Sequence, residues 1–169
     1  ADEAIGLARE AAELARGGTS STTLAMSLAA LADFQIDDGD LDAAASALDE
    51  AAPVVGPAAS TPAGAFHAAH GRLDRARGDF GGAIARFVTA LEHARAIGAL
   101  EHRATVLDDL GTVAVELDES DRARQLFAAA DACRRAEGDH GPPNWRRTVI
   151  AARAAVDIDG PAVDWTVDD

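Results

Sequence analysis

The sequence predicts an all-α protein built from helical hairpins. Alanine supplies about a quarter of the 169 residues and aromatic side chains only 4%. This composition favours closely packed helices, because strands are enriched in β-branched and aromatic residues. Segments of about 14–18 residues carry apolar side chains at intervals of three and four, the helical period. Short clusters of Gly, Pro and Asp separate these segments, and none of them alternates apolar and polar residues as a strand does.

The expected elements follow in order along the chain. Residues 1–18 are predicted to be the trailing helix of a preceding hairpin, and residues 19–58, 59–98 and 99–138 three complete hairpins. Residues 139–169 should form a capping helix near Trp145–Val156 and an acidic tail. The unpaired first helix and a start that is not Met indicate a piece of a larger protein.

Capping residues mark the ends of these helices. Side-chain oxygens of Asp40, Asp79 and Ser120 are expected to accept the first free N–H groups of a helix. Thr61-Pro62 is expected to be a cap followed by proline at the first helical position. A left-handed residue is expected at five helix C-termini, where the sequence has Gly17, Gly39, Gly78, Gly98 and Gly138.

Small and bulky residues recur along the chain. A shift of 39 residues aligns Gly39 with Gly78, and a further shift of 40 reaches Asp118. Antiparallel helices approach closely only where Gly or Ala lies at their crossing, and a lone hairpin cannot bury its face, so the hairpins should stack. The equivalent positions are small at Ala32, Gly71 and Gly111, small at Ala44, Ala83 and Ala123, bulky at Leu48, Phe87 and Phe127, and small at Ala51, Ala90 and Ala130.

This pattern resembles the tetratricopeptide repeat (TPR), whose signature is a small residue in the first helix followed by Ala, a bulky aromatic and Ala in the second. The second and third hairpins match it well and the first more loosely. The chain departs from the family in its longer period and in lacking the family's Trp, Tyr and closing Pro. The resemblance implies a right-handed α–α superhelix, a TPR-like solenoid whose first helices line a concave groove.

The longer period is similar to the C-terminal helical repeats of large bacterial transcriptional regulators, either LuxR-type proteins or signalling ATPases. The similarity rests on the run Ala123–Ala130, the following Arg134–Gly138, and Pro142-Pro143 before a closing helix. It implies a cytoplasmic sensor or scaffold domain, whose partners include other domains of the parent chain. On the closing helix, Arg146, Arg147 and Arg153 are expected to form the polar outer face of a terminal repeat.

Composition excludes several classes of function. The 29 acidic residues outnumber 15 basic ones, which are all arginine, and the net charge of −14 argues against a nucleic-acid-binding surface. The single cysteine, Cys133, allows no internal disulfide and is expected to be a small core residue. The sequence contains no uninterrupted apolar stretch of about 18 residues, so it predicts no membrane-spanning helix.

No motif predicts catalysis, a cofactor or a metal. His67 and His70 share a helix face but lack a third ligand, so we expect a partly buried structural pair. His93 and His102 flank the turn at Gly98 and are expected to be solvated. The acidic run 37–42 lacks the glycine position and distal Glu of an EF-hand, and its carboxylates are expected to serve as helix caps.

The candidate binding residues come from the first helices of the hairpins. Arg72 and Arg75 lie three residues apart on one face, and their guanidiniums could hold a carboxylate with paired hydrogen bonds. The alternative is that they pair with Asp74, Asp79 or carboxylates of neighbouring helices. The full candidate set for a peptide or ligand in the groove is Asp33, Arg72, Arg75, Asp108, Thr112 and Glu116.

Three function classes remain open at this point. An interaction scaffold or sensor that binds a protein or peptide is favoured. A regulatory domain that binds a small effector is the alternative, which a deep pocket would favour. An enzyme has no motif in its support, and a homodimer through the uncovered first helix is compatible with the pattern.

Overall fold

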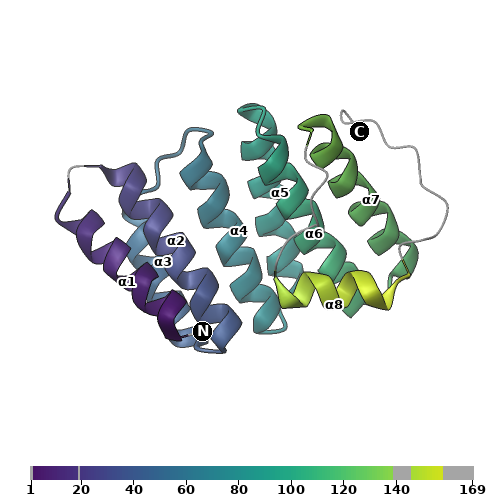
Figure 1. Ribbon diagram of the computed structural model, residues 1–169, viewed down its shortest axis with the longest axis horizontal. Coiled ribbons are helices and arrows are strands. Elements are labelled where there is room, and N and C mark those ends of the chain that lie inside the picture. The colour runs from purple at the N-terminus through teal and green to yellow at the C-terminus, as the bar shows by residue number, and fades with distance from the viewer. Residues whose placement is uncertain (1, 19, 139–145, 158–169) are drawn as a thin grey trace. The chain divides into compact units, whose positions relative to one another are not determined.

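The computed structural model describes residues 2–18, 20–138 and 146–157, and within these ranges the chain is helical and contains no strand. The all-α class is therefore confirmed. None of the described helices is long and apolar enough to cross a membrane. The acidic tail and Pro142-Pro143 lie outside the described residues. The elements in Figure 1 are α1 (Asp2–Arg16), α2 (Ser21–Asp38), α3 (Leu41–Ala51), η1 (Ala52–Val54), α4 (Thr61–Ala76), α5 (Phe80–Ala96), α6 (Leu100–Glu116), α7 (Ser120–Ala136) and α8 (Arg147–Ala155).

The chain divides into two compact units, Ala1–His93 and Ala94–Asp169, and α5 crosses the boundary between them. In the first unit α2 packs against α1, α3 and α4. Its core includes the fully buried side chains of Leu28 and Leu48. In the second unit α6 and α7 form a hairpin, and α8 packs across it through Val149.

Two of the predicted N-caps are confirmed. Asp40 Oδ1 accepts a hydrogen bond from the backbone N–H of Ala43 at 3.1 Å, at the start of α3. Asp79 Oδ1 accepts one from Gly82 at 2.9 Å, at the start of α5. Each carboxylate thus satisfies a backbone donor that has no partner inside the helix.

Two other predicted caps are wrong by one residue. Ser60, not Thr61, caps α4, because its extended backbone lets its hydroxyl accept from Ala63 N–H at 3.3 Å. At α7 the N-cap position is Glu119, which makes no side-chain cap hydrogen bond, and Ser120 already lies inside the helix.

The left-handed helix ends largely follow the prediction. Gly39, Gly78, Gly98 and Gly138 all have positive φ, between 69° and 88°. Gly17 is the exception, because the backbone continues its helical turn there: the N–H of Gly17 donates to Glu13 O and that of Gly18 to Ala15 O. In the third hairpin the equivalent position is Asp118, which adopts a φ of 60° without being glycine.

The small and bulky positions of the repeat behave as predicted. Phe87 and Phe127 are fully buried, and each ring lies directly over the glycine of the preceding helix, Gly71 and Gly111 respectively. The alanines at the flanking repeat positions are also buried, with at most 1% exposed: Ala32, Ala44, Ala51, Ala83, Ala90, Ala123 and Ala130.

Candidate functional site

In the first unit, two candidate residues form a direct ion pair. Arg72 on α4 donates from Nη1 to both carboxylate oxygens of Asp33 on α2, at 2.8 and 2.9 Å. Only 7% of Arg72 is exposed. Arg72 therefore pairs with a carboxylate of a neighbouring helix, which is one of the alternatives that the sequence left open. Burial makes this pair a link between α2 and α4, since breaking it would strand a desolvated charge.

Arg75 lies one turn further along α4 and is half-buried. It is in the last turn of the helix, where the partial negative charge of the C-terminus favours a cation. Arg72 and Arg75 thus share a helix but differ in their surroundings. The prediction that both serve as anchors for an anionic ligand is not tested by this geometry.

In the second unit, Asp108 is the centre of a buried charge cluster. The aspartate lies on α6 and is 0% exposed. Arg134 of α7 donates to its Oδ2, and Arg153 of α8 donates to its Oδ1 from Nε at 3.1 Å. Both guanidiniums also bind Asp131 of α7, Arg134 at 3.2 Å and Arg153 at 2.9 and 3.2 Å. The two carboxylates and the two guanidiniums balance each other in charge. The cluster joins α6, α7 and α8.

The electrostatics of this cluster follow from its burial. Desolvation raises the pKa of Asp108, while the charge of Arg153 and the hydrogen bonds from both guanidiniums oppose that shift. The guanidinium carbon of Arg153 also lies 4.8 Å from the centre of the Phe127 ring, a cation–π distance. The capping helix α8 is therefore held by charge as well as by apolar contact.

Two further candidates lie on α6 near Asp108. The Thr112 hydroxyl donates to the backbone carbonyl of Asp108 at 2.9 Å and is buried. Glu116 is exposed at the end of the helix. Asp108 and Thr112 therefore lie together, as the groove prediction placed them on one helix. Both are buried inside the second unit, where their side-chain oxygens already form hydrogen bonds with other residues of the protein.

The prediction that three arginines form the polar outer face of the closing helix is wrong for two of them. Arg153 and Arg146 are buried, 7% and 9% exposed, and only Arg147 is exposed. Arg146 Nη1 lies 3.5 Å from Asp109 Oδ1. The physical reason is that the adjacent aspartates of α6 are both buried and require counter-charges.

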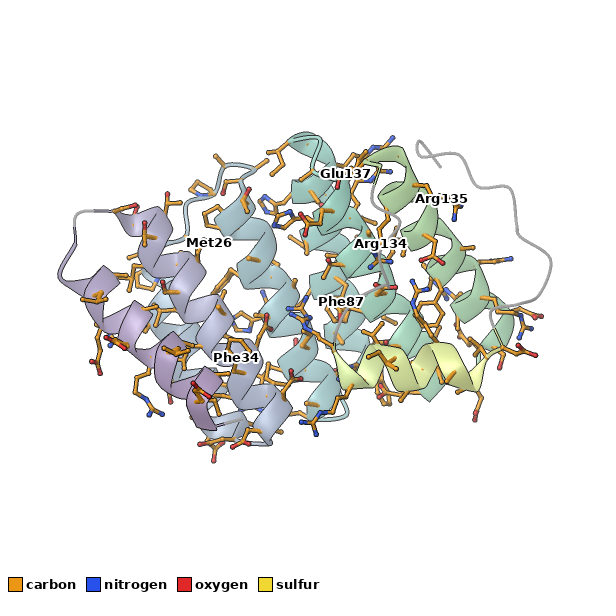
Figure 2. All side chains as sticks on the ribbon, viewed as in Figure 1. Met26, Phe34, Phe87, Arg134, Arg135 and Glu137 are labelled. Carbon is orange, nitrogen blue, oxygen red and sulfur yellow. The ribbon has the colours of Figure 1, made fainter. Side chains whose placement is uncertain are left out.

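A sequence signal for these partners exists. Arg146 and Arg153 are seven residues apart, a spacing of two helical turns that indicates one face from the sequence, although in the structure Arg146 is the extended N-cap of α8. Arg134 follows Asp131 by three residues and contacts it within α7. In Figure 2 Arg134 and its neighbour Arg135 extend to different sides of α7, and only Arg134 is buried.

His67 and His70 are both half-buried, as predicted. His67 on α4 stacks on His93 of α5, with ring centres 5.4 Å apart, while His70 meets Phe66 edge-on at 4.7 Å. His93 is thus half-buried inside a helix, and the prediction that it lies in a solvated turn is wrong. Burial, then the charges of His93, Arg86 and His70, lower the pKa of His67 to about 4.

Two other features bear on possible chemistry. Cys133 is buried in α7, as predicted, and burial raises the pKa of its thiol. Among the described residues, no three side chains of His, Cys, Asp or Glu are grouped as metal ligands. Comparisons with protein-family models, curated proteins and solved structures find no match to this chain.

Proposed function

We propose that this chain is a non-catalytic interaction module of a cytoplasmic bacterial regulatory protein, with helical hairpins arranged as a TPR-like right-handed superhelix that binds a protein or peptide. The supporting observation is the repeated crossing: Phe87 over Gly71 in one unit and Phe127 over Gly111 in the other. Stacked hairpins with one such crossing per repeat form extended surfaces that repeat proteins use for binding.

The first helices of the hairpins would carry the binding surface. Their strongest charges are engaged within the protein, Arg72 with Asp33 and Asp108 with two arginines. We therefore expect recognition to depend on the half-buried side chains of these helices, including Met26 on α2 and Thr105 on α6. An extended peptide would supply its own backbone polar groups and apolar side chains to such a surface.

A matched pair of threonines tests this proposal. Thr105 on α6 and Thr89 on α5 are both half-buried, and each hydroxyl donates to the carbonyl four residues earlier at 3.0 Å. Thr105 lies on a first helix and Thr89 on a second helix. The two positions therefore differ in the surface to which they belong.

The experiment selects peptides from a random display library against the purified wild-type protein and measures their affinity by fluorescence anisotropy. Thr105→Arg should weaken binding by about tenfold or more, because a long charged side chain would occupy the surface, and Thr89→Arg should leave it unchanged. Failure to select any peptide, or equal loss with both variants, would contradict the proposal.

A further inference from the structure

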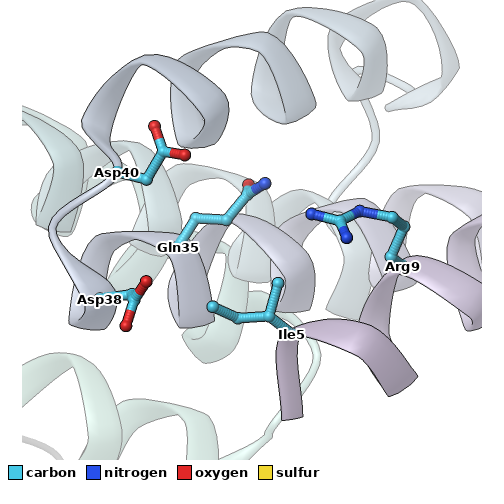
Figure 3. Close-up of a pocket in the computed structure, with 5 residues that line it drawn as sticks. All are labelled: Ile5, Arg9, Gln35, Asp38 and Asp40. Atoms are coloured by element: carbon cyan, nitrogen blue, oxygen red, sulfur yellow. The ribbon is translucent and has the colours of Figure 1, made fainter. Parts of the chain in front are cut away.

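A polar pocket opens in the first unit between α1 and the turn that joins α2 to α3. It encloses about 250 Å³ and is lined by Ile5 and Arg9 of α1, Gln35 and Asp38 of α2, and Asp40 at the start of α3. Figure 3 shows Gln35 at the centre, with Arg9 on one side and the two aspartates on the other. None of the groove candidates is among the residues that line this pocket.

Gln35 carries the first sign of a ligand. The residue is only 6% exposed, and its Oε1 is buried without a hydrogen-bond partner. A buried carbonyl oxygen left unpaired is unfavourable, and buried polar groups in proteins are nearly always satisfied. A ligand that brings an N–H donor into the pocket would satisfy this amide.

The charges around Gln35 give a second, independent sign. Asp38 is the last residue of α2, whose final turn contains no basic residue. A carboxylate there lies at the negative end of the helix dipole, where a cation is favoured instead. Asp40 adds a second carboxylate, of which one oxygen caps α3.

Arg9 supplies the opposite charge from α1. Its guanidinium extends toward Gln35 in Figure 3. A guanidinium binds a carboxylate with two parallel hydrogen bonds. The pocket therefore presents one site for an anion and two carboxylates for cations, around an amide oxygen, Gln35 Oε1, that lacks a hydrogen-bond partner.

We propose that this pocket binds a free basic α-amino acid, such as lysine, ornithine or arginine. The ligand's carboxylate lies on Arg9, and its two cationic groups face Asp38 and Asp40. One ligand N–H donates to the Gln35 amide, and the aliphatic stem contacts Ile5. The two positive charges and one negative charge of the ligand complement the pocket, whose volume suits a molecule of this size. This inference goes beyond the proposed peptide-binding role and does not depend on it.

Isothermal titration calorimetry with the whole chain tests the ligand class. L-Lysine, L-ornithine and L-arginine should bind, whereas norleucine, which lacks the side-chain amine, and cadaverine, which lacks the carboxylate, should each bind about tenfold more weakly or not at all. No heat of binding from the three basic amino acids at about 10 mM would overturn the proposal. Equal or tighter binding of cadaverine would overturn it in favour of a simple polyamine site.

A pair of neighbouring aspartates locates the site. Asp38→Asn removes a pocket carboxylate and should weaken lysine binding about tenfold. Asp37→Asn makes the same change of charge on the adjacent exposed residue, outside the pocket lining, and should have little effect. Gln35→Leu should also weaken lysine binding about tenfold, while circular dichroism shows an intact helical fold. Equal affinities in wild type and Asp38→Asn would show that lysine binds elsewhere and would refute the assignment.

Discussion

The ring of Phe87 occupies the space that a side chain on Gly71 would need. A Cβ placed on Gly71 would lie 2.6 Å from Cε1 of this fully buried ring, closer than real contacts allow. The same relationship holds between Gly111 and Phe127, at 2.5 Å. In the first hairpin the equivalent residues are Ala32 and Leu48. There alanine, which is larger than glycine, faces leucine, which is smaller than phenylalanine.

Gly71→Ala should therefore destabilise the protein by about 1–3 kcal/mol, because the rigid ring cannot move out of the way in a close-packed core. Urea unfolding followed by circular dichroism measures this change. Gly6→Ala is the control, since a Cβ on Gly6 meets nothing within 4 Å. It should stabilise α1 by up to about 1 kcal/mol through helix propensity.

The double variant Gly71→Ala/Phe87→Leu reproduces the Ala32 and Leu48 arrangement of the first hairpin. It should be more stable than the sum of the two single changes predicts, by about 1 kcal/mol or more, because contacting residues are coupled. Additive free energies would show that the two residues do not contact each other as described.

Asp118→Gly should stabilise the protein by about 0.5–1 kcal/mol. Asp118 has a φ of 60°, where glycine is free of the strain that a Cβ introduces, and the equivalent residues Gly39 and Gly78 are already glycine. The side chain of Asp118 is exposed, so its removal leaves no cavity. Urea unfolding measures the gain, and Asp118→Ala should show a loss in the same assay.

Asp108→Asn should cost about 3–5 kcal/mol, because it leaves Arg134 and Arg153 buried against the single remaining carboxylate of Asp131. Hydrogen exchange should show α8 losing protection, since Arg153 is its charged link to α6. Asp121→Asn on α7 is the matched control: that carboxylate is exposed, and the change should cost about 1 kcal/mol or less. Unchanged protection of α8 in Asp108→Asn would contradict the role given to the cluster.

Local patterns predicted the helices and their crossings but not the charge clusters. Ala83 and Ala123 are buried as the repeat requires, since their positions follow from helical period and from size. The inward orientation of Arg153 depends instead on which face of α8 meets α6. The seven-residue spacing of Arg146 and Arg153 indicates a shared face but does not say which helix that face meets. Gln35 is similar, because glutamine is usually exposed and its burial depends on the helices that pack against α2.

The half-buried His67 makes the first unit sensitive to acid. The pKa of His67 is about 4 in the folded protein, against an ordinary value of 6.5. Between these two pH values the unfolded chain binds a proton that the folded chain does not, so stability falls as the pH is lowered through this window. Burial also lowers the pKa of His70, which acts in the same direction.

His67→Gln should therefore reduce the loss of thermal stability between pH 7 and pH 5. The midpoint of thermal unfolding, measured by circular dichroism at both pH values, gives this difference for each variant. All other groups are common to the two proteins, so the comparison with wild type isolates the histidine. His102→Gln makes the same substitution on α6 and serves as the control for the substitution itself. If His67→Gln lost as much stability as wild type over this range, the burial of His67 would not be the source of the effect.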